Sequence, residues 1–138
     1  MNSKQPMADE GFALMSAAFA VHNEVGGGLS EEIYQECLEL ELADRSIVYE
    51  SQVVLPVFYK GQKLKRTYIP DLLTHGSIVV ELKSVSNLAQ GHEAQLLNYM
   101  RLTRKPVGYL INFAPIKEVE WKRYILSEFT SNLNSNLH

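Results

Sequence analysis

The sequence predicts an α/β protein with a mixed β-sheet, and three observations lead to this fold class. Helical periodicity dominates residues 8–44, strand-like composition dominates residues 47–83, and another helical segment precedes an apolar run at residues 107–113. A helix between two strands indicates a parallel crossover, whereas short turns join antiparallel strands. We therefore expect two N-terminal helices, a three-strand antiparallel meander, a helix, and one or two further strands.

Apolar periodicity and helix-end residues predict the two N-terminal helices. Residues 8–25 form the first, which the glycines at 26–28 end, and its predicted apolar side consists of Phe12, Met15, Phe19 and His22. Ser30 is a typical N-cap for the second helix, which runs to about residue 44 and has acidic side chains in its first turn. Two neighbouring apolar stripes predict that a broad side of this helix is buried. The first stripe is Ile33, Cys37 and Leu40, and the second is Tyr34, Leu38 and Leu42.

Strand-like composition continues through residues 47–58, 63–73 and 78–83. Turns are predicted at Lys60-Gly61 and at His75-Gly76. Pro56 indicates a bulge or a sheet edge near the end of the first strand. These segments make up the predicted antiparallel meander.

Residues 87–104 return to a helical period that places two sets of side chains on different sides of one helix. The apolar set is Leu96 and Met100, and the other set is His92, Gln95 and Tyr99. Residues 107–113 are continuously apolar, which indicates a strand deep in the sheet and parallel to residues 78–83. Residues 119–126 are the last predicted strand.

Length and composition predict one domain over residues 1–129 and a polar tail over residues 130–138. A chain of 138 residues, 46% of them hydrophobic, is long enough for a single packed core. No apolar run approaches the length of a membrane span, and residues 1–10 lack the features of a signal peptide, so we expect no membrane partner and a cytoplasmic location. The single cysteine, Cys37, excludes an internal disulfide and an all-cysteine metal cluster built from one chain.

Charge is distributed unevenly along the chain, although its net value is only −3. Residues 1–59 carry 2 basic and 10 acidic side chains, whereas residues 60–125 carry 11 basic and 5 acidic ones. The net charge argues against a general nucleic-acid binder, but the basic half is compatible with a polyanion that approaches one face. An unevenly charged solvated surface explains the distribution equally well.

Residues 68–83 are the stretch that can carry chemistry, a hairpin with Asp71 in its first strand and Glu81 and Lys83 in its second. Alternation along the second strand places Glu81 and Lys83 on one face and apolar side chains on the other. If Asp71 lies opposite Glu81, the two Cβ atoms are about 4.5–5.5 Å apart. Such a carboxylate pair suits a hard divalent cation such as Mg²⁺.

The register of the hairpin decides whether this pair forms. A two-residue turn at His75-Gly76 would place Asp71 opposite Val80 and direct Asp71 into the core. A three-residue loop, or a bulge at Gly76, would place Asp71 opposite Glu81. The metal-site hypothesis therefore predicts an irregular turn at this position.

Several motifs in order resemble the PD-(D/E)XK nuclease superfamily. They are Pro70-Asp71 and Glu81-Leu82-Lys83, within the succession helix, three-strand meander, helix, strand. More narrowly, residues 28–34 (Gly-Leu-Ser-Glu-Glu-Ile-Tyr), 68–83, 92–99 and 110–113 resemble the bacterial GxxExxY proteins. The resemblance covers about residues 26–122 and implies a restriction-endonuclease-like core.

The resemblance also implies an activity, a metal-dependent nuclease that hydrolyses phosphodiester bonds in DNA with Mg²⁺ or Mn²⁺ as cofactor. Asp71 and Glu81 would bind the ion together with the Leu82 carbonyl. Lys83 would orient or help to deprotonate the attacking water and stabilise charge on the phosphate. Glu31 resembles the extra acidic residue that many such nucleases contribute to the metal site.

Three residues of the third predicted helix are candidates for nucleic-acid binding. Gln95 and Tyr99 resemble the Gln-x-x-x-Tyr motif of RecB-like nucleases, and His92 lies on the same side of the helix. Each also has an ordinary explanation, since an aromatic side chain packs at a core edge and a lone histidine is more often a surface residue. Glu31 likewise suits the first turn of any helix.

The alternative is a non-catalytic nucleic-acid-binding or protein-assembly module that keeps the nuclease fold. The sequence pI of about 5.8 and the lack of a separate DNA-gripping domain favour this alternative. A homodimer, a protein partner or a very small substrate would each compensate for the missing grip.

Overall fold

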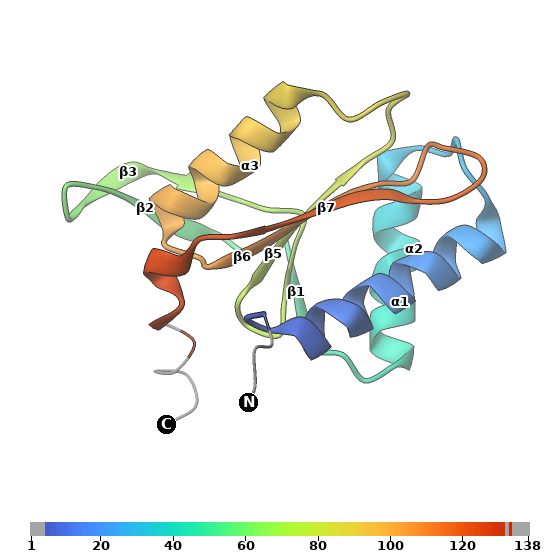
Figure 1. The fold of residues 1–138 in the computed structure, drawn as a ribbon, viewed down its shortest axis with the longest axis horizontal. Coiled ribbons are helices and arrows are strands. Elements are labelled where there is room, and N and C mark those ends of the chain that lie inside the picture. Colours follow the sequence, from blue (N-terminus) through green and yellow to red (C-terminus); the bar gives the residue numbers. More distant parts are fainter. Residues whose placement is uncertain (1–4, 132, 134–138) are drawn as a thin grey trace.

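The structure is a computed structural model that describes residues 5–131 and residue 133 of the chain. Its helices cover the two faces of a central sheet, and a two-stranded hairpin extends beyond one end of that sheet (Figure 1). The described helices are α1 (Ala8–Val25), α2 (Glu31–Asp44) and α3 (Gln90–Thr103), with a 3₁₀ turn at Ser127–Phe129. The described strands are β1 (Tyr49–Ser51), β2 (Leu55–Tyr59), β3 (Gln62–Tyr68), β4 (Leu72–Thr74), β5 (Ile78–Lys83), β6 (Val107–Asn112) and β7 (Glu120–Ile125).

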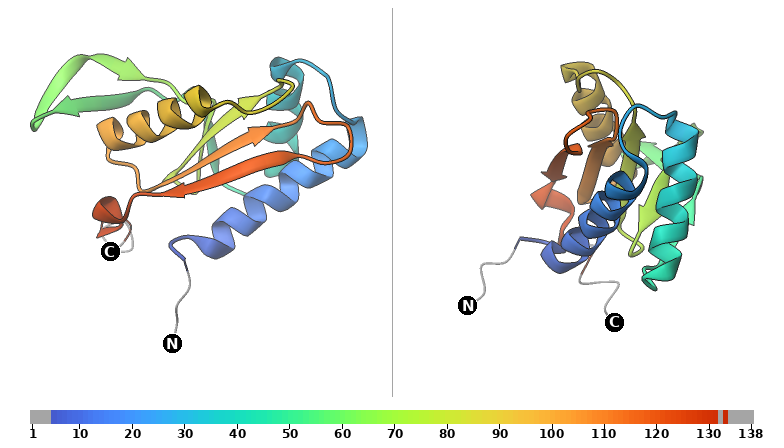
Figure 2. Two further views of the ribbon diagram at one scale, coloured as in Figure 1. Left: turned by 45° about the horizontal axis from the view of Figure 1, so that its top comes forward. Right: turned by 90° about the vertical axis from the view of Figure 1, so that its right-hand side faces the viewer.

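The central sheet is mixed and has the strand order β1-β4-β5-β6-β7. β5 and β6 run parallel, whereas the other neighbouring pairs are antiparallel. α3 makes the crossover between the two parallel strands, and every residue of β6 is buried (Figure 2). The predicted α/β fold class and the deep position of residues 107–113 are therefore confirmed.

The predicted meander is present, but its two longer strands are broken. β1, β4 and β5 form an antiparallel meander, while β2 and β3 form a separate two-stranded sheet between β1 and β4 in sequence. Gln52, at φ 56°, and Pro70 lie at the breaks, because neither suits an unbroken ladder of strand hydrogen bonds. The expected irregularity near Pro56 is also present, since the register shifts between Pro56 and Phe58.

Packing of α1 differs from the prediction. Phe12 and Phe19 are 76% and 40% exposed, whereas the buried face of the helix consists mainly of smaller side chains such as Ala17, Ala18 and Val21. Small side chains let the helix approach the sheet closely, and a Cβ at Gly11 would overlap the Tyr109 hydroxyl. The predicted stripe is half confirmed: Met15 and His22 are buried, whereas Phe12 and Phe19 are exposed because small side chains take their place against the sheet.

α2 is buried along a narrower side than predicted. Tyr34, Leu38 and Leu42 are fully buried, but Ile33 and Leu40 are exposed. One core cluster fills the space between α1, α2 and the sheet, and a second lies between α3, the hairpin and the opposite face. The two faces of β5 therefore both meet packed side chains.

None of the helices within the described residues is long and apolar enough to cross a membrane. The predicted polar tail, residues 130–138, lies largely outside the described residues.

Candidate active site

The β4–β5 hairpin has the register that places Asp71 opposite Glu81. Leu72 pairs with Val80 and Thr74 pairs with Ile78, so the loop between the strands has three residues. Its first two residues, His75 and Gly76, have φ values of 54° and 72°, and the Ser77 amide donates to the Thr74 carbonyl at 3.1 Å. The predicted irregular turn is confirmed and takes the form of a three-residue loop, and the next position along the ladder after Leu72 brings Asp71 to Glu81.

Asp71 is held on both sides by neighbouring elements. Its Oδ2 accepts a hydrogen bond of 2.7 Å from the Leu82 amide of β5, and its carbonyl accepts one of 2.9 Å from Gln35 Nε2 of α2. The Gln52 amide donates to the same carbonyl at 3.4 Å. These contacts fix the aspartate at the point where β4 begins.

Glu81 is largely buried beside Asp71 and titrates near neutral pH. Burial raises the pKa of Glu81 to about 7, because the charged carboxylate loses solvation. A hydrogen bond from the Tyr68 hydroxyl favours the charged form, whereas the charge of Asp71 and a hydrogen bond between the two carboxyl groups disfavour it. Lys83, two residues along the same face of β5, also favours the charged form.

The oxygen atoms gathered here match the donors that Mg²⁺ and Mn²⁺ prefer. Two carboxyl groups lie in contact, and a cation between them would offset the repulsion that adds to burial in raising the pKa of Glu81. The N–H and C=O groups of one strand residue point to the same side, so the Leu82 carbonyl points toward Asp71, as its amide does. The donor set therefore fits a hard divalent cation.

A cleft of about 420 Å³ opens on the α3 side of this pair. Glu81 and Lys83 line it from β5, and Gln95, Tyr99 and His92 line it from α3. The structure thus brings five of the predicted site residues to one cleft. Gln95 is exposed, which leaves its amide accessible from the cleft.

Tyr68 closes one wall of the cleft. Its ring stacks on Tyr99 with centroids 4.0 Å apart and an interplanar angle of 9°. Tyr99 therefore positions Tyr68, and Tyr68 in turn holds Glu81. Burial and the nearby charge of Glu81 raise the pKa of Tyr68, so the phenol stays a hydrogen-bond donor.

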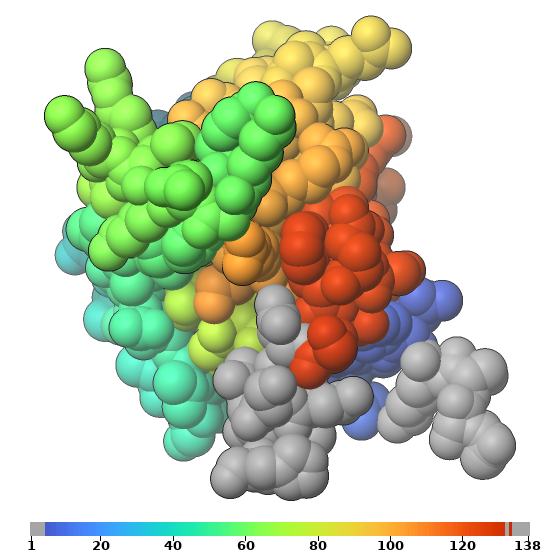
Figure 3. Space-filling model, turned by 90° about the vertical axis from the view of Figure 1, so that its left-hand side faces the viewer, coloured from blue at the N-terminus to red at the C-terminus, as the bar shows by residue number. Residues whose placement is uncertain are grey.

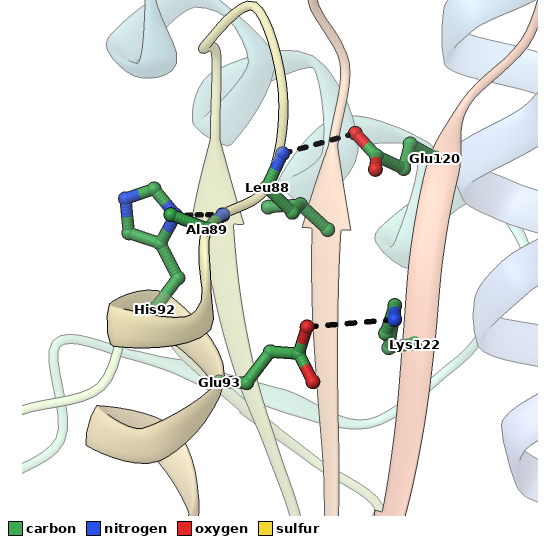
Figure 4. Close-up of polar contacts among 6 residues, drawn as sticks. All are labelled: Leu88, Ala89, His92, Glu93, Glu120 and Lys122. Atoms are coloured by element: carbon green, nitrogen blue, oxygen red, sulfur yellow. Dashed lines mark hydrogen bonds and ion pairs between the residues drawn. The ribbon is translucent and has the colours of Figure 1, made fainter.

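His92 also serves the structure of α3. Its Nδ1 accepts a hydrogen bond of 3.0 Å from the Ala89 amide, as Figure 4 shows, and so satisfies a free N–H at the start of the helix. The same figure shows Glu93 paired with Lys122 of β7, at 3.4 Å between Oε2 and Nζ. These contacts fix the N-terminal end of α3 beside the cleft.

Glu31 lies near the carboxylate pair but is not grouped with it. Together with Gln35, Asp71 and Leu82 it lines a second hollow of about 430 Å³, on the α2 side. Its Oε2 accepts a hydrogen bond of 3.3 Å from the Ser84 amide. In the part of the chain that the structure describes, no three His, Cys, Asp or Glu side chains are close enough to hold a metal ion together.

Three residues important to this geometry, Tyr68, Gln35 and Asn112, were not among the predicted site residues. Gln35 follows Glu31 by one helical turn, so the polar spacing of α2 could have suggested it. Tyr68 precedes the Pro-Asp pair, but only the folded structure turns it toward Glu81. Asn112 gives no local signal, because its partners Val85 and Glu120 come from a loop and a neighbouring strand.

Comparison with known proteins identifies the class of fold. The sequence matches the family described as the PD-(D/E)XK nuclease superfamily over residues 8–124. No curated protein sequence matches the chain. The chain therefore belongs to the PD-(D/E)XK nuclease superfamily, and the resemblance to that superfamily is confirmed.

Two solved structures share the fold. The crystal structure of SSO0001 has a TM-score of 0.51 and 19% identity over 77% of this chain, which spans 57% of that protein's length. An alkaline exonuclease (LHK-Exo) from Laribacter hongkongensis has a TM-score of 0.50 and 8% identity, with 99% of this chain and 80% of the exonuclease covered. The architecture is therefore restriction-endonuclease-like and typical of nucleases.

Proposed function

We propose that the protein is a metal-dependent nuclease that hydrolyses phosphodiester bonds in DNA. The observation that carries this proposal is the Asp71 and Glu81 pair, which a three-residue loop brings into contact beside Lys83. The superfamily match and the nuclease-like fold support the same activity. Basic side chains concentrate in the half of the chain that forms the cleft, which supports a nucleic-acid substrate. We propose DNA because the resemblance to PD-(D/E)XK nucleases implies it.

Asp71, Glu81 and the Leu82 carbonyl are the residues proposed to hold Mg²⁺ or Mn²⁺. A bound divalent ion supplies charge neutralisation at the phosphate and lowers the pKa of the attacking water. The Lys83 ammonium lies on the same face of β5 as Glu81 and is placed to stabilise negative charge on the phosphate. Gln95, Tyr99 and His92 would contact the nucleic acid along the opposite wall of the cleft.

We further place the chain in the GxxExxY group, because each of its signature residues has a local task. Gly28 has a φ of 89°, which favours glycine. The Tyr34 hydroxyl donates to the Gly26 carbonyl at 2.6 Å and accepts from the Leu29 amide at 3.1 Å. Glu31 binds the Ser84 amide just beyond β5, so the signature joins α2 to the strand that carries Lys83.

The direct test is cleavage of labelled single- and double-stranded DNA and RNA by the purified protein with Mg²⁺ or Mn²⁺. Asp71→Asn and Lys83→Ala should each lower the cleavage rate by about a hundredfold or more. Asp44→Asn and Lys117→Ala are matched controls at exposed positions outside the cleft, and they should cleave like the wild type. Cleavage that survives both site substitutions would reject the assignment.

A non-catalytic module that keeps the fold is the second candidate. The position of Glu31 favours this candidate, because its carboxylate accepts a hydrogen bond from the Ser84 amide and does not join Asp71 and Glu81 as a third acidic ligand among the described residues. Metal binding separates the candidates, because a nuclease site should bind Mn²⁺ whereas a module without chemistry has no need to. A folded protein that neither binds metal nor cleaves nucleic acid would establish the second candidate.

A homodimer is the proposed assembly. An apolar groove of about 440 Å³ between α1 and β7 is lined by Phe12, Phe19 and Trp121, and β7 is an edge strand of the sheet. Light scattering should show a dimer that Phe12→Ser with Trp121→Ser converts to a monomer; a wild-type monomer at all concentrations would reject this assembly.

A further inference from the structure

We propose that the β2–β3 hairpin, residues 55–68, is a DNA-binding arm that lies in the major groove of duplex DNA while a phosphate occupies the cleft. This inference rests on the proposed function and adds the shape of the substrate and the element that grips it.

The hairpin is the most uniformly basic element of the chain. Residues 55–68 contain Lys60, Lys63, Lys65 and Arg66 and no acidic residue. Among the residues that the structure describes, Lys63, Lys65 and Arg66 have no ion-pair or hydrogen-bond partner for their side chains. Unpaired positive charge at this density favours a polyanion and releases its counterions on binding.

Both faces of the hairpin tip are open to solvent. Every residue from 62 to 67 of β3 is exposed. Figure 3 shows the hairpin standing out from the molecular surface beside α3. A strand pair normally buries one face against other elements, so a ribbon with two open faces has room to enter a groove.

The base of the hairpin, in contrast, is fixed to the body of the protein. Leu55, Val57 and Tyr68 are buried in the core cluster that also contains Leu96 and Met100 of α3. Further out, the Arg104 guanidinium lies 4.7 Å from the centroid of the Phe58 ring. The arm therefore has a defined direction, which a groove-binding element requires.

The reach of the arm matches duplex DNA. A strand of this length extends about 20 Å, and the major groove admits a two-stranded β-ribbon. Thr67 and Tyr68, at the inner end of β3, line the cleft that contains Glu81. The groove contact and the reactive phosphate can therefore belong to one duplex.

The chemistry of the tip favours a duplex over a single strand. Single-stranded nucleic acid is gripped mainly by exposed aromatic rings on which bases stack. β3 has no aromatic residue before Tyr68, and the one exposed ring near the tip, that of Tyr59, has the Lys60 ammonium over it at 5.4 Å from the ring centroid. With four basic side chains and one exposed ring, the tip offers mainly phosphate contacts rather than base stacking.

The test is equilibrium binding of a fluorescent duplex and of the matching single strand in EDTA, at several salt concentrations. Lys63→Gln with Lys65→Gln should weaken duplex binding at least about tenfold at low salt and reduce the salt slope by about 2. Arg45→Gln with Lys117→Gln removes the same charge from exposed sites away from the hairpin and should change neither value. Thermal melting of both double variants checks that they fold.

Three results would overturn the inference. They are wild-type affinity and salt slope in the hairpin variant, absence of duplex binding by the wild type at low salt, and equal wild-type affinity for single strand and duplex. Because EDTA removes metal chemistry, binding is judged apart from cleavage. A protein that binds duplex through the hairpin but never cleaves it would retain this inference and reject the nuclease activity.

Discussion

The hydroxyl of Tyr68 donates a hydrogen bond to the side chain of Glu81, and burial favours the neutral form of this carboxyl group. Glu81 therefore lies between opposing influences, with burial and Asp71 raising its pKa and Tyr68 and Lys83 lowering it. The balance leaves Glu81 able to change its protonation state near neutral pH. Two consequences can be measured at this single residue.

The first concerns the stability of the metal-free protein. The folded-state pKa of Glu81 is about 7, against 4.5 for an unperturbed glutamate, so the folded state holds this proton more tightly than the unfolded state. The resulting stabilisation is complete below the unfolded pKa and is lost as pH rises through the folded pKa. In EDTA, the free energy of unfolding should fall by about 1–3 kcal/mol across this window. Urea unfolding checks this.

Glu81→Gln is the matched control for this pH dependence, because glutamine keeps an acceptor for Tyr68 but does not titrate. The variant should show a flatter profile than the wild type over the same window. Parallel profiles would mean that Glu81 ionises normally in the folded state.

The second consequence concerns the hydrogen bond itself. Tyr68→Phe keeps the stack on Tyr99 but removes the donor that favours the charged form of Glu81. The pKa of Glu81 should therefore rise further, by about one unit. NMR titration of the side-chain carboxyl measures it, and Tyr59→Phe, in the exposed part of the hairpin, should leave it unchanged. A pKa that stays constant or falls would contradict the assigned direction.

At the scale of elements, the loop that follows β5 is fixed by hydrogen bonds from a single side chain. The loop after β5 is held by Asn112, which is fully buried at the end of β6. Its Oδ1 accepts from the Val85 amide at 3.0 Å, and its Nδ2 donates to the Val85 carbonyl and to Glu120, each at 2.9 Å. One amide thus joins the loop beyond Lys83 to β7.

Removing that amide should destabilise the protein. Asn112→Ala leaves both backbone groups of Val85 without their side-chain partner, and we expect a loss of about 2–4 kcal/mol in the free energy of unfolding. Asn98→Ala, on the exposed side of α3, should cost less than about 0.5 kcal/mol. Urea denaturation of both variants makes the comparison, and similar losses would show that the buried network contributes little.

Replacing glycine by alanine should change the stability in opposite directions in the β4–β5 loop and in α3. Gly76→Ala places a side chain at a φ of 72° and should destabilise by about 1 kcal/mol, although no atom lies within 4 Å of the added Cβ. Gly91→Ala, in the first turn of α3 where space is also free, should stabilise by about 0.3–1 kcal/mol. Thermal unfolding of the pair checks the contrast, and stabilisation by Gly76→Ala would contradict the loop geometry.

Across the whole molecule, charge is separated between two surfaces. The hollow on the α2 side is lined by Glu31, Glu32, Glu36 and Glu39, whereas the hairpin on the other side of the cleft is basic. An acidic surface attracts cations and a basic one attracts phosphates. The carboxylate pair of Asp71 and Glu81 lies where the two hollows meet.

This arrangement predicts metal-linked stability that depends on pH. At about a hundredfold excess over its Kd, Mn²⁺ should stabilise the folded state by about 2–3 kcal/mol, a rise of several degrees in Tm. The rise should be larger at about pH 8 than at about pH 5.5, because protons compete with the cation for Glu81. Differential scanning calorimetry measures it; Asp71→Asn should abolish the rise and Asp44→Asn should not. An equal rise in both variants would assign the binding to another site.

Much of the fold was predictable from local patterns. Periods of 3.6 and 2 residues located the helices and most strands, and the helical crossover required β5 and β6 to be parallel. The buried side of α1 was only partly predictable: Met15 is buried as expected, but small side chains such as Ala17 and Ala18 face the sheet while Phe12 remains exposed. Close approach of backbones, which needs small side chains, is a property of the assembled layers.

Local sequence carries the superfamily motifs and leaves two hairpin registers open, since one short turn separates Asp71 from Glu81 and Lys83. The folded hairpin selects between these registers, because a single extra residue in the loop changes which side chains face each other. The tertiary structure likewise decided that Tyr68 turns toward Glu81, that Glu31 binds Ser84 instead of joining the pair, and that the basic residues of β3 stand free. These contacts join residues distant in sequence, and packing of α2, α3 and the hairpin against the sheet sets them rather than any local preference.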